Sequence, residues 1–345
     1  MSIESEITRI NNNIAATYTA LNAKGATMPE TENSANLAST VATVPSSDPV
    51  NKAFTVDNGV LSAPKNITFS EDTFAGVTSI GSYALYYKYY CSANTTNKTG
   101  GVINFDSVTS VGEYGLQNAF KNCNITSVSF NSLVQLNKDY LLSYSFQNNR
   151  NLTSISFPSL TSVTGSYAIY YCFNKCTSLT SVDFPELETA TGSSCISDSF
   201  SECTALTTAS FPKLKTLGYS SCYNMFKGCT SLESVDFSSL TSIGSTGLYY
   251  TFDGCTSLTT ISFPSLTTVD SIGLSHCFQN CTGLATISFP ALTTVKSDSF
   301  GTYTFYGCTS LTEIHFPAAI QSTIEGLTGY SSKFGATNAT IYFDL

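Results

Sequence analysis

Cysteine and histidine are the residues of this chain that could do the most chemistry. The sequence holds 12 Cys and two His. A recurring Cys would place neighbouring sulfurs about 5 Å apart along a stack, where disulfides are conceivable. Cys is also among the most buried residue types, so we predict buried thiols, close to 12 of them free. The recurring position is held by Cys123, Cys176, Cys203, Cys229, Cys255, Cys281 and Cys308, with Asn149 as the exception.

The spacing of the Cys and His residues gives little support for a metal site or a catalytic site. Two Cys-x3-Cys pairs occur, and His276 adjoins the second pair. Zinc needs four converging ligands, which neither pair supplies. His276 and His315 lack a repeated acidic partner, and no nucleophile or phosphate-binding motif recurs. We therefore expect no metal, no cofactor, no catalytic residue and no enzymatic activity. The pairs are Cys172/Cys176 and Cys277/Cys281.

Tyrosine is better suited to recognition, because its rigid apolar ring carries a polar tip. Many of the 20 Tyr gather in variable segments, most densely around Lys88. Tyr114, Tyr140 and Tyr167 also share one position, six residues before a recurring Phe. These rings either contact a ligand or only pack between neighbouring units. The candidate ligand-binding residues are Tyr83, Tyr86, Tyr87, Tyr89, Tyr90, Tyr170, Tyr171, Tyr249 and Tyr250.

The composition excludes several classes of protein. Only 11% of the residues are charged, less than half of the roughly 25% usual in soluble domains. A disordered chain would have far fewer than 23 Phe and 20 Tyr. A net charge of −9 argues against a nucleic-acid partner, and no run of about 18 apolar residues predicts a membrane span.

A repeat must position all of these residues. Phe recurs in two series at spacings of 25 to 27 residues, and the unit reads F-x-x-C-T-S-L-T-S-I-S-F-P-x-L-T-x-V. Leu-x-x-Ile-x-Phe predicts a short strand, which Pro then ends. Pro-x-Leu-x-x-Val predicts a second inward-facing edge. A single unit cannot bury such a face alone, so neighbours must stack into a solenoid.

This unit resembles the leucine-rich repeats of BspA-like surface proteins, over about residues 70 to 330. Phe replaces the usual aliphatic residue at the end of the strand. The resemblance implies a mainly β leucine-rich-repeat solenoid, with a short strand and an irregular or helical turn in each repeat. It also implies a binding scaffold without enzymatic activity. We expect the solenoid over residues 71–316 and a C-terminal cap over 317–345.

The first 45 residues follow a different pattern. An apolar stripe at 4/3 spacing predicts a small N-terminal α-helical segment for attachment or oligomerisation, and a second short helix over 35–44. With Lys24-Gly-Ala-Thr-Met-Pro, this segment resembles the attachment regions of phage tail-fibre-like proteins. The alternative is a cap for the first repeat. Residues 46–70 are expected to form a linker and cap strands. The stripe consists of Ile3, Ile7, Ile10, Ile14 and Leu21.

The polar N-terminus lacks the pattern of a signal peptide, so we expect either a trimmed export signal or none. The favoured function is non-enzymatic recognition by a phage tail component in the virion. It would contact a bacterial surface glycan or protein and join other tail subunits through residues 1–45. A homo-oligomer is a further expectation. The alternative is a BspA-like adhesin at the bacterial cell surface that binds host or matrix proteins. A third possibility is a structural spacer.

Overall fold

The structure is a computed structural model that describes residues 55–57, 60–62, 68–70, 72–91 and 100–345. The chain divides into two compact units, Met1–Ile67 and Thr68–Leu345. In the first unit, β1 (Thr55–Asp57) and β2 (Val60–Ser62) pair as an antiparallel hairpin. The helices predicted within residues 1–45, with Ile3, Ile7, Ile10, Ile14 and Leu21, lie outside the described residues.

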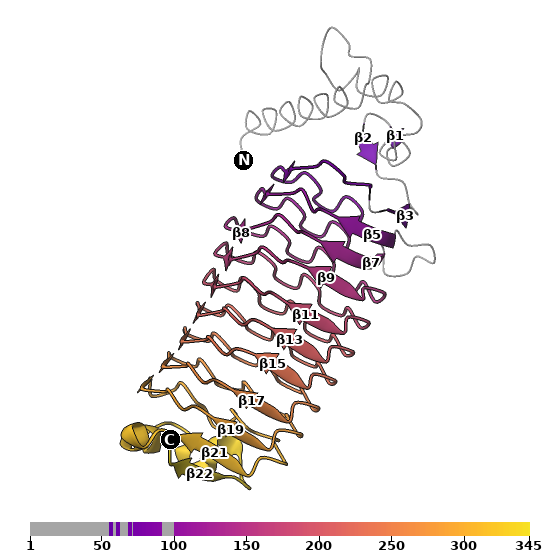
Figure 1. Cartoon of the computed structure of the whole chain (residues 1–345). Coiled ribbons are helices and arrows are strands. Elements are labelled where there is room, and N and C mark those ends of the chain that lie inside the picture. Colours follow the sequence, from indigo (N-terminus) through magenta and orange to yellow (C-terminus); the bar gives the residue numbers. More distant parts are fainter. Residues whose placement is uncertain (1–54, 58–59, 63–67, 71, 92–99) are drawn as a thin grey trace. The chain divides into compact units, whose positions relative to one another are not determined.

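The second unit is a leucine-rich-repeat solenoid of about ten turns, as the repeat predicts (Figure 1). One side, the long-strand side, is a column of parallel strands that pair in three successive sheets of four, three and four strands. Its strands are β3 (Thr68–Phe69), β5 (Gly100–Asn104), β7 (Asn124–Ser129), β9 (Ser154–Ser156), β11 (Ser181–Asp183), β13 (Thr208–Ser210), β15 (Ser234–Asp236), β17 (Thr260–Ser262), β19 (Thr286–Ser288), β21 (Glu313–Phe316) and β22 (Thr340–Phe343).

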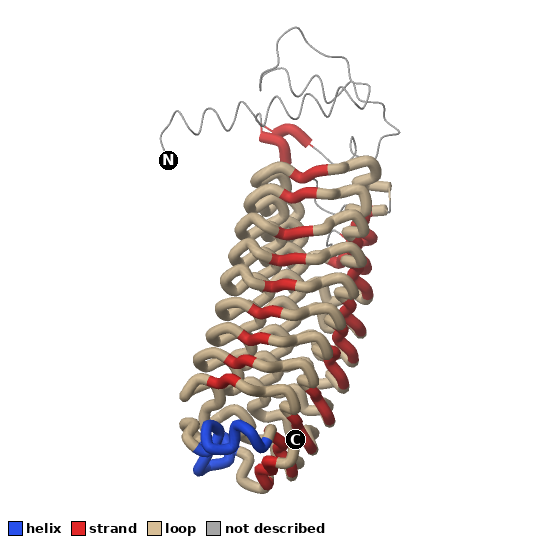
Figure 2. Tube along the Cα trace, turned by 60° about the vertical axis from the view of Figure 1, so that its left-hand side comes forward, coloured by secondary structure: helices blue, strands red, loops and turns tan. Residues whose placement is uncertain are grey.

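A second column of two-residue strands forms the short-strand side, and Figure 2 shows both columns in red. It corresponds to the second inward-facing edge predicted from Pro-x-Leu-x-x-Val. Its strands are β4 (Ser79–Ile80), β6 (Ser110–Val111), β8 (Gln135–Leu136), β10 (Ser162–Val163), β12 (Thr189–Ala190), β14 (Thr216–Leu217), β16 (Ser242–Ile243), β18 (Thr268–Val269) and β20 (Thr294–Val295). The rest of each coil is a run of hydrogen-bonded turns, which we call the turn side.

The C-terminal end contains the helices of the described residues. The 3-10 helix η1 (Ala318–Ile320), the helix α3 (Gln321–Glu325) and the 3-10 helix η2 (Tyr330–Gly335) precede β22. β22 then pairs in parallel with β21, which extends the long-strand side by one more strand.

Two columns of stacked Phe rings fill the interior. The column beneath the long-strand side includes Phe157 and Phe184, whose ring centroids lie 5.4 Å apart. The column beneath the turn side includes Phe146 and Phe173, 5.6 Å apart and nearly parallel. Both series are fully buried, and burial of aromatic surface is the main favourable term in such a core. The two recurring Phe series of the sequence are therefore the two core columns.

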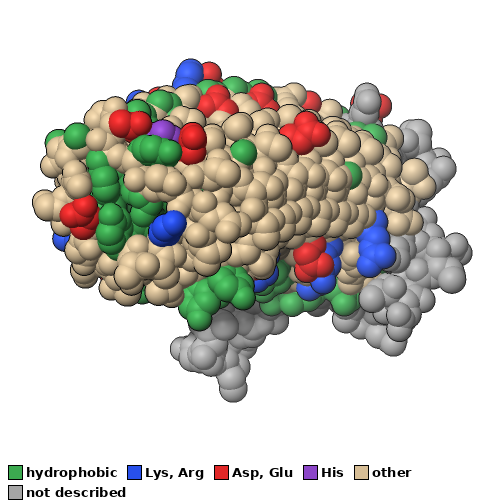
Figure 3. Space-filling model, turned by 90° about the horizontal axis from the view of Figure 1, so that it is seen from below, with side chains coloured by type: hydrophobic (Ala, Val, Ile, Leu, Met, Phe, Trp, Pro, Cys, Tyr) green, Lys and Arg blue, Asp and Glu red, His purple; other side chains and the backbone are tan. Residues whose placement is uncertain are grey.

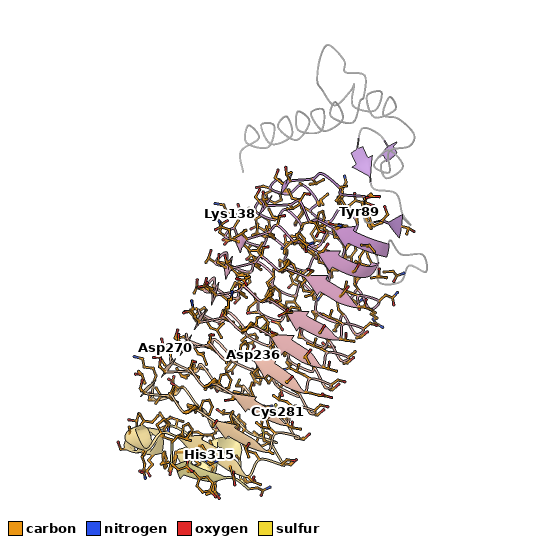
Figure 4. The ribbon with its side chains drawn as sticks, viewed as in Figure 1. Tyr89, Lys138, Asp236, Asp270, Cys281 and His315 are labelled. Atoms are coloured by element: carbon orange, nitrogen blue, oxygen red, sulfur yellow. The ribbon has the colours of Figure 1, made fainter. Side chains whose placement is uncertain are left out.

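A ladder of cysteines runs beside the second Phe column. All 12 cysteines are buried, as predicted. From Cys176 onward, each ladder thiol donates to the carbonyl of the recurring Phe one coil earlier, as Cys203 Sγ does to Phe173 O at 3.2 Å. Cys281 makes the same bond to Phe252 O at 3.0 Å (Figure 4). Asn149, the exception in the sequence, makes it with its side-chain amide, which donates to Phe120 O at 2.8 Å.

Charged side chains are sparse on the solenoid surface. On the face seen in Figure 3, uncharged polar groups predominate and the acidic and basic side chains are scattered. Thr hydroxyls donate to the preceding coil instead, as Thr267 Oγ1 does to Thr241 O at 3.0 Å. The low charge of the sequence thus follows from a ladder surface built with short polar side chains.

Candidate recognition surface

The turn side has an unusual backbone that sets where its side chains lie. Within a coil, non-glycine residues with positive φ recur every four residues, for example Tyr140 (φ 55°), Tyr144 (φ 57°) and Asn148 (φ 59°). This conformation costs an L-residue about 1–2 kcal/mol. Each of the three donates its backbone N–H to the next coil, Tyr144 to Tyr170 O at 2.8 Å. Hydrogen bonds between coils therefore hold these left-handed positions, one above another, in columns.

The first column of the turn side is aromatic over four coils. Tyr83, Tyr114, Tyr140 and Tyr167 stack with successive ring centroids 4.9, 5.0 and 5.0 Å apart. Their planes lie within 16° of parallel. Stacking from coil to coil covers the ring faces, so the column presents ring edges and hydroxyl groups outward.

The next column lies four residues further along each coil and is more varied. Tyr144 and Tyr171 stack at 5.1 Å. Further along, His276 lies between Tyr250 at 4.4 Å and Tyr303 at 4.9 Å. His276, two residues before Phe278, occupies the register that Tyr171 and Tyr250 occupy before their own Phe. This shared repeat position is the sequence feature that could have placed His276 in the aromatic column. In the structure its neighbours are aromatic rings.

Asp198 interrupts this column as a buried carboxylate. Its side chain is 4% exposed and accepts hydrogen bonds from the Tyr171 hydroxyl and the Asn224 amide. Burial raises the pKa of Asp198 to about 6, although both bonds and the charge of Lys227 act in the opposite direction. Burial and the nearby Asp198 together raise the pKa of Tyr171 above its usual range. Sequence reasoning missed Asp198, although it lies two residues before Phe200.

The first coil carries the most exposed tyrosines of the predicted set. Tyr83, Tyr86, Tyr87 and Tyr90 are 40–49% exposed and form a cluster through edge-to-face and tilted contacts. We call these four residues the tyrosine cluster. Tyr86 and Tyr87 contact each other at 4.7 Å.

Tyr89 is not part of that cluster. Its ring is 5% exposed and stacks on Phe120 at 5.2 Å, and burial raises its pKa to about 12 (Figure 4). Tyr89 therefore fills the place of the recurring Phe in the first coil. The sequence spacing obscures this, because Tyr89 precedes Phe120 by more than one regular repeat.

The remaining candidates form two edge-to-face pairs. Tyr170 and Tyr171 lie 4.6 Å apart, and Tyr249 and Tyr250 lie at the same distance. Lys227 Nζ sits 4.8 Å from the Tyr250 ring centroid and 3.0 Å from Asp253 Oδ2. Burial is the main cause that raises the pKa of Tyr170 well above its usual range. These four rings are half-buried and continue the turn side beyond the cluster, and the exposed Tyr219, Tyr303 and Tyr306 add to it.

The long-strand side offers a different chemistry. Its outward positions are Ser and Thr over most of the solenoid, and a shallow depression of about 580 Å³ lies over its C-terminal strands. His315 lines it and contacts Asp344 at 2.9 Å and Glu313 at 3.4 Å (Figure 4). These two carboxylates raise the pKa of His315, against the effect of burial.

The described part of the chain contains no cluster suited to metal binding, and its buried thiols are poorly suited to act as nucleophiles. No group of three or more His, Cys, Asp or Glu is placed to hold a metal ion there. Burial raises the pKa of Cys176, Cys229 and Cys277 well above that of an ordinary thiol, which disfavours the thiolate. No helix among the described residues is long and apolar enough to cross a membrane.

Comparison with known proteins identifies the repeat. The sequence profile of the family described as "BspA type Leucine rich repeat region", with six copies, matches residues 63–172, 86–224 and 222–332. Comparison with curated proteins found no match.

Solved structures of similar fold come from several bacteria. A leucine rich cell surface protein from Faecalibacterium prausnitzii A2-165 is 16% identical, with a TM-score of 0.32, over 80% of this chain and 95% of that one. A leucine-rich repeat protein from Eubacterium ventriosum is 24% identical, with a TM-score of 0.37, over 67% and 62% of the two chains. A leucine rich repeat protein from T. pallidum is 18% identical, with a TM-score of 0.35, over 72% and 87%.

All three TM-scores are below 0.5, so the assignment rests on the repeat profile. Its matches extend from residue 63 to residue 332 and include both Phe columns and the cysteine ladder. The chain belongs to the family of BspA type leucine rich repeat proteins.

Proposed function

We propose that this chain is a recognition protein of the bacterial cell surface, and that the turn side, above all the tyrosine cluster, binds a protein target. The match to the BspA type repeat profile supports the cell-surface part of this proposal. We infer the binding side from the tyrosine stacking, which places rigid, amphipathic rings on one side of the solenoid. These rings are most exposed in the tyrosine cluster. Tyr is enriched at protein interfaces, whereas the long-strand side presents mostly Ser and Thr.

A protein target fits the stacked column better than a glycan does. Sugars stack on open aromatic faces, and the faces in the column of Tyr114 and Tyr140 are covered by rings about 5 Å away. Ring edges and hydroxyls remain, and these suit hydrogen bonds and edge contacts to a polypeptide. A glycan is the competing ligand for the first coil, where the cluster is most exposed.

The test compares purified full-length protein with a triple variant, Tyr86→Ser, Tyr87→Ser and Tyr90→Ser. Both are passed over a panel of purified extracellular-matrix proteins and a panel of glycans. We expect saturable binding to a matrix protein that weakens at least tenfold in the variant. Tyr342→Ser, at an exposed tyrosine on β22, is the matched control and should bind like the wild type. An unchanged Kd in the triple variant would overturn the tyrosine cluster as the binding surface, and no binding to either panel would support a structural spacer. Binding to glycans alone would overturn the protein target.

A phage tail component remains a second candidate, favoured only by the N-terminal sequence motif. That motif lies outside the described residues, and the comparisons provide no support for it. Removal of residues 1–45 should abolish incorporation into tail particles if this candidate is right. Labelling of intact producing cells with an antibody against the solenoid would favour the surface protein.

A further inference from the structure

Two cysteines at the start of the solenoid are unusually close to each other. Cys91 Sγ and Cys123 Sγ lie 2.9 Å apart, whereas non-bonded heavy atoms normally rest about 3.5–4 Å apart. Both side chains are buried, at 7% and 1% exposure. The two residues come from adjacent coils, so a bond between them would join those coils covalently.

The local sequence explains why this pair meets. Cys123 belongs to the ladder, and its thiol donates to Tyr89 O at 3.0 Å because Tyr89 replaces the recurring Phe. Cys91 comes two residues after Tyr89, and its thiol approaches the same carbonyl oxygen at 3.5 Å. Two sulfurs therefore converge on one oxygen. Later ladder thiols each approach a Phe carbonyl of their own, as Cys229 does at Phe200 O.

The backbone around Cys91 is already fixed in this arrangement. Cys91 N donates to Lys121 O at 3.0 Å, and Asn122 Nδ2 donates to Cys91 O at 3.1 Å. These bonds fix the backbone of Cys91 against the residues that directly precede Cys123, so oxidation needs little rearrangement of the chain. A disulfide delivers its full stabilisation when the native geometry already accommodates it.

We propose that Cys91 and Cys123 are a disulfide-forming pair that fastens the first coil to the second in an oxidising environment. The oxidant is a small disulfide such as oxidised glutathione. One protein thiolate attacks it and forms a mixed disulfide, which releases one small thiolate. The second protein thiolate then displaces the other small thiolate and closes the protein disulfide. Two S–H bonds are lost, one S–S bond forms, and the two small thiols released carry the two protons.

Burial sets when this exchange takes place. With both sulfurs buried, it precedes the packing of the two coils or uses their transient opening. The resulting bond closes the segment between residues 91 and 123 and restricts the unfolded chain. It also anchors the coil that carries the tyrosine cluster, although the disulfide itself does not depend on the proposed function.

The test counts thiols in the full-length protein after refolding in a buffer of oxidised and reduced glutathione. The protein is unfolded without reductant and alkylated, and its mass is measured before and after reduction. We expect two fewer alkylated thiols than the 12 of the reduced chain, and a peptide map that links Cys91 to Cys123. Alkylation of all 12, or a link between two other cysteines, would overturn the proposal.

Two variants separate this pair from the rest of the ladder. Cys91→Ser should show no linked peptide and the same melting temperature with and without reductant. Cys308→Ser, a ladder thiol at the other end of the solenoid, is the matched control and should keep the link. The wild-type melting temperature should fall by several degrees on reduction, and no fall at all would show that the bond does not fasten the coils.

Discussion

The long-strand side and the turn side share one core but achieve their regularity differently. On the long-strand side, parallel strands pair in register and the outward residues repeat as Ser and Thr. On the turn side, the backbone repeats through left-handed positions whose side chains include Tyr, Asn, Ser, Asp and His. A hydrogen-bonded backbone that accepts such different side chains leaves one side of the coil free to vary, which suits recognition.

The largest expected effect tests whether both sides depend on the same core. Phe263→Ala, beneath the long-strand side, should cost about 3–5 kcal/mol in the free energy of unfolding, because it leaves a cavity in a stacked column. Phe278→Ala, beneath the turn side, should cost a similar amount, since both rings are fully buried. Urea unfolding measures both. A loss below about 1 kcal/mol at either position would show that this column is not core.

The second prediction concerns the close approach of neighbouring coils at the corner between the short-strand side and the turn side. A Cβ added to Gly192 would lie 2.3 Å from Gly165 O of the preceding coil, so the two coils must move apart. We expect Gly192→Ala to cost up to about 3 kcal/mol by overpacking.

Gly81 provides the control for that substitution. A Cβ at Gly81 meets nothing within 4 Å, and Gly81→Ala should leave the unfolding midpoint in urea nearly unchanged. Equal losses at the two positions would mean that the close approach at Gly192 is not what limits stability.

A substitution of Asp198, on the turn side, is expected to raise the free energy of unfolding, whereas the substitutions above lower it. Its pKa is raised from 3.8 to about 6 in the folded chain, so its contribution is most favourable below about pH 4 and is lost as the pH rises through 6. Asp198→Asn keeps an acceptor for the Tyr171 hydroxyl without a charge to bury. At pH 7.5 we expect the variant to be more stable by about 1–2 kcal/mol, less than the roughly 3 kcal/mol of the full shift.

The measurement is the free energy of unfolding from pH 4 to 8. The difference between wild type and Asp198→Asn should grow between about pH 4 and pH 6, the range between the unfolded and folded pKa of this carboxyl group, and level off above it. A variant that is less stable than wild type at pH 7.5 would show that the hydrogen bonds of the carboxylate outweigh its burial.

The smallest effect belongs to the Thr ladder that runs beside the short-strand side. Thr267→Val removes one exposed hydroxyl, whose bond to Thr241 O is one of many alike. We expect a loss below about 1 kcal/mol. A loss as large as that of Gly192→Ala would mean that the Thr ladder, and not only the packed corner, holds the coils together.

The sequence alone predicted the repeating parts of this protein. The spacing of Phe157, Phe184 and their equivalents predicted the solenoid and its core, because a fixed period places equal residues in one column. The same logic predicted the buried cysteines. It also predicted Tyr114, Tyr140 and Tyr167 as a set, which the structure shows as one stack.

Only the tertiary structure decided what depends on contacts between coils. Tyr89 is core and its neighbours are surface because the insertion after Cys91 shifts the register, so the sequence spacing misplaces them. The left-handed positions could not be predicted either, since many of them are held by Tyr, Ser or Thr, which are not among the residue types enriched at positive φ. Bonds to the next coil impose that conformation. The burial of Asp198 and the approach of Cys91 to Cys123 follow from the same stacking, which no single repeat contains.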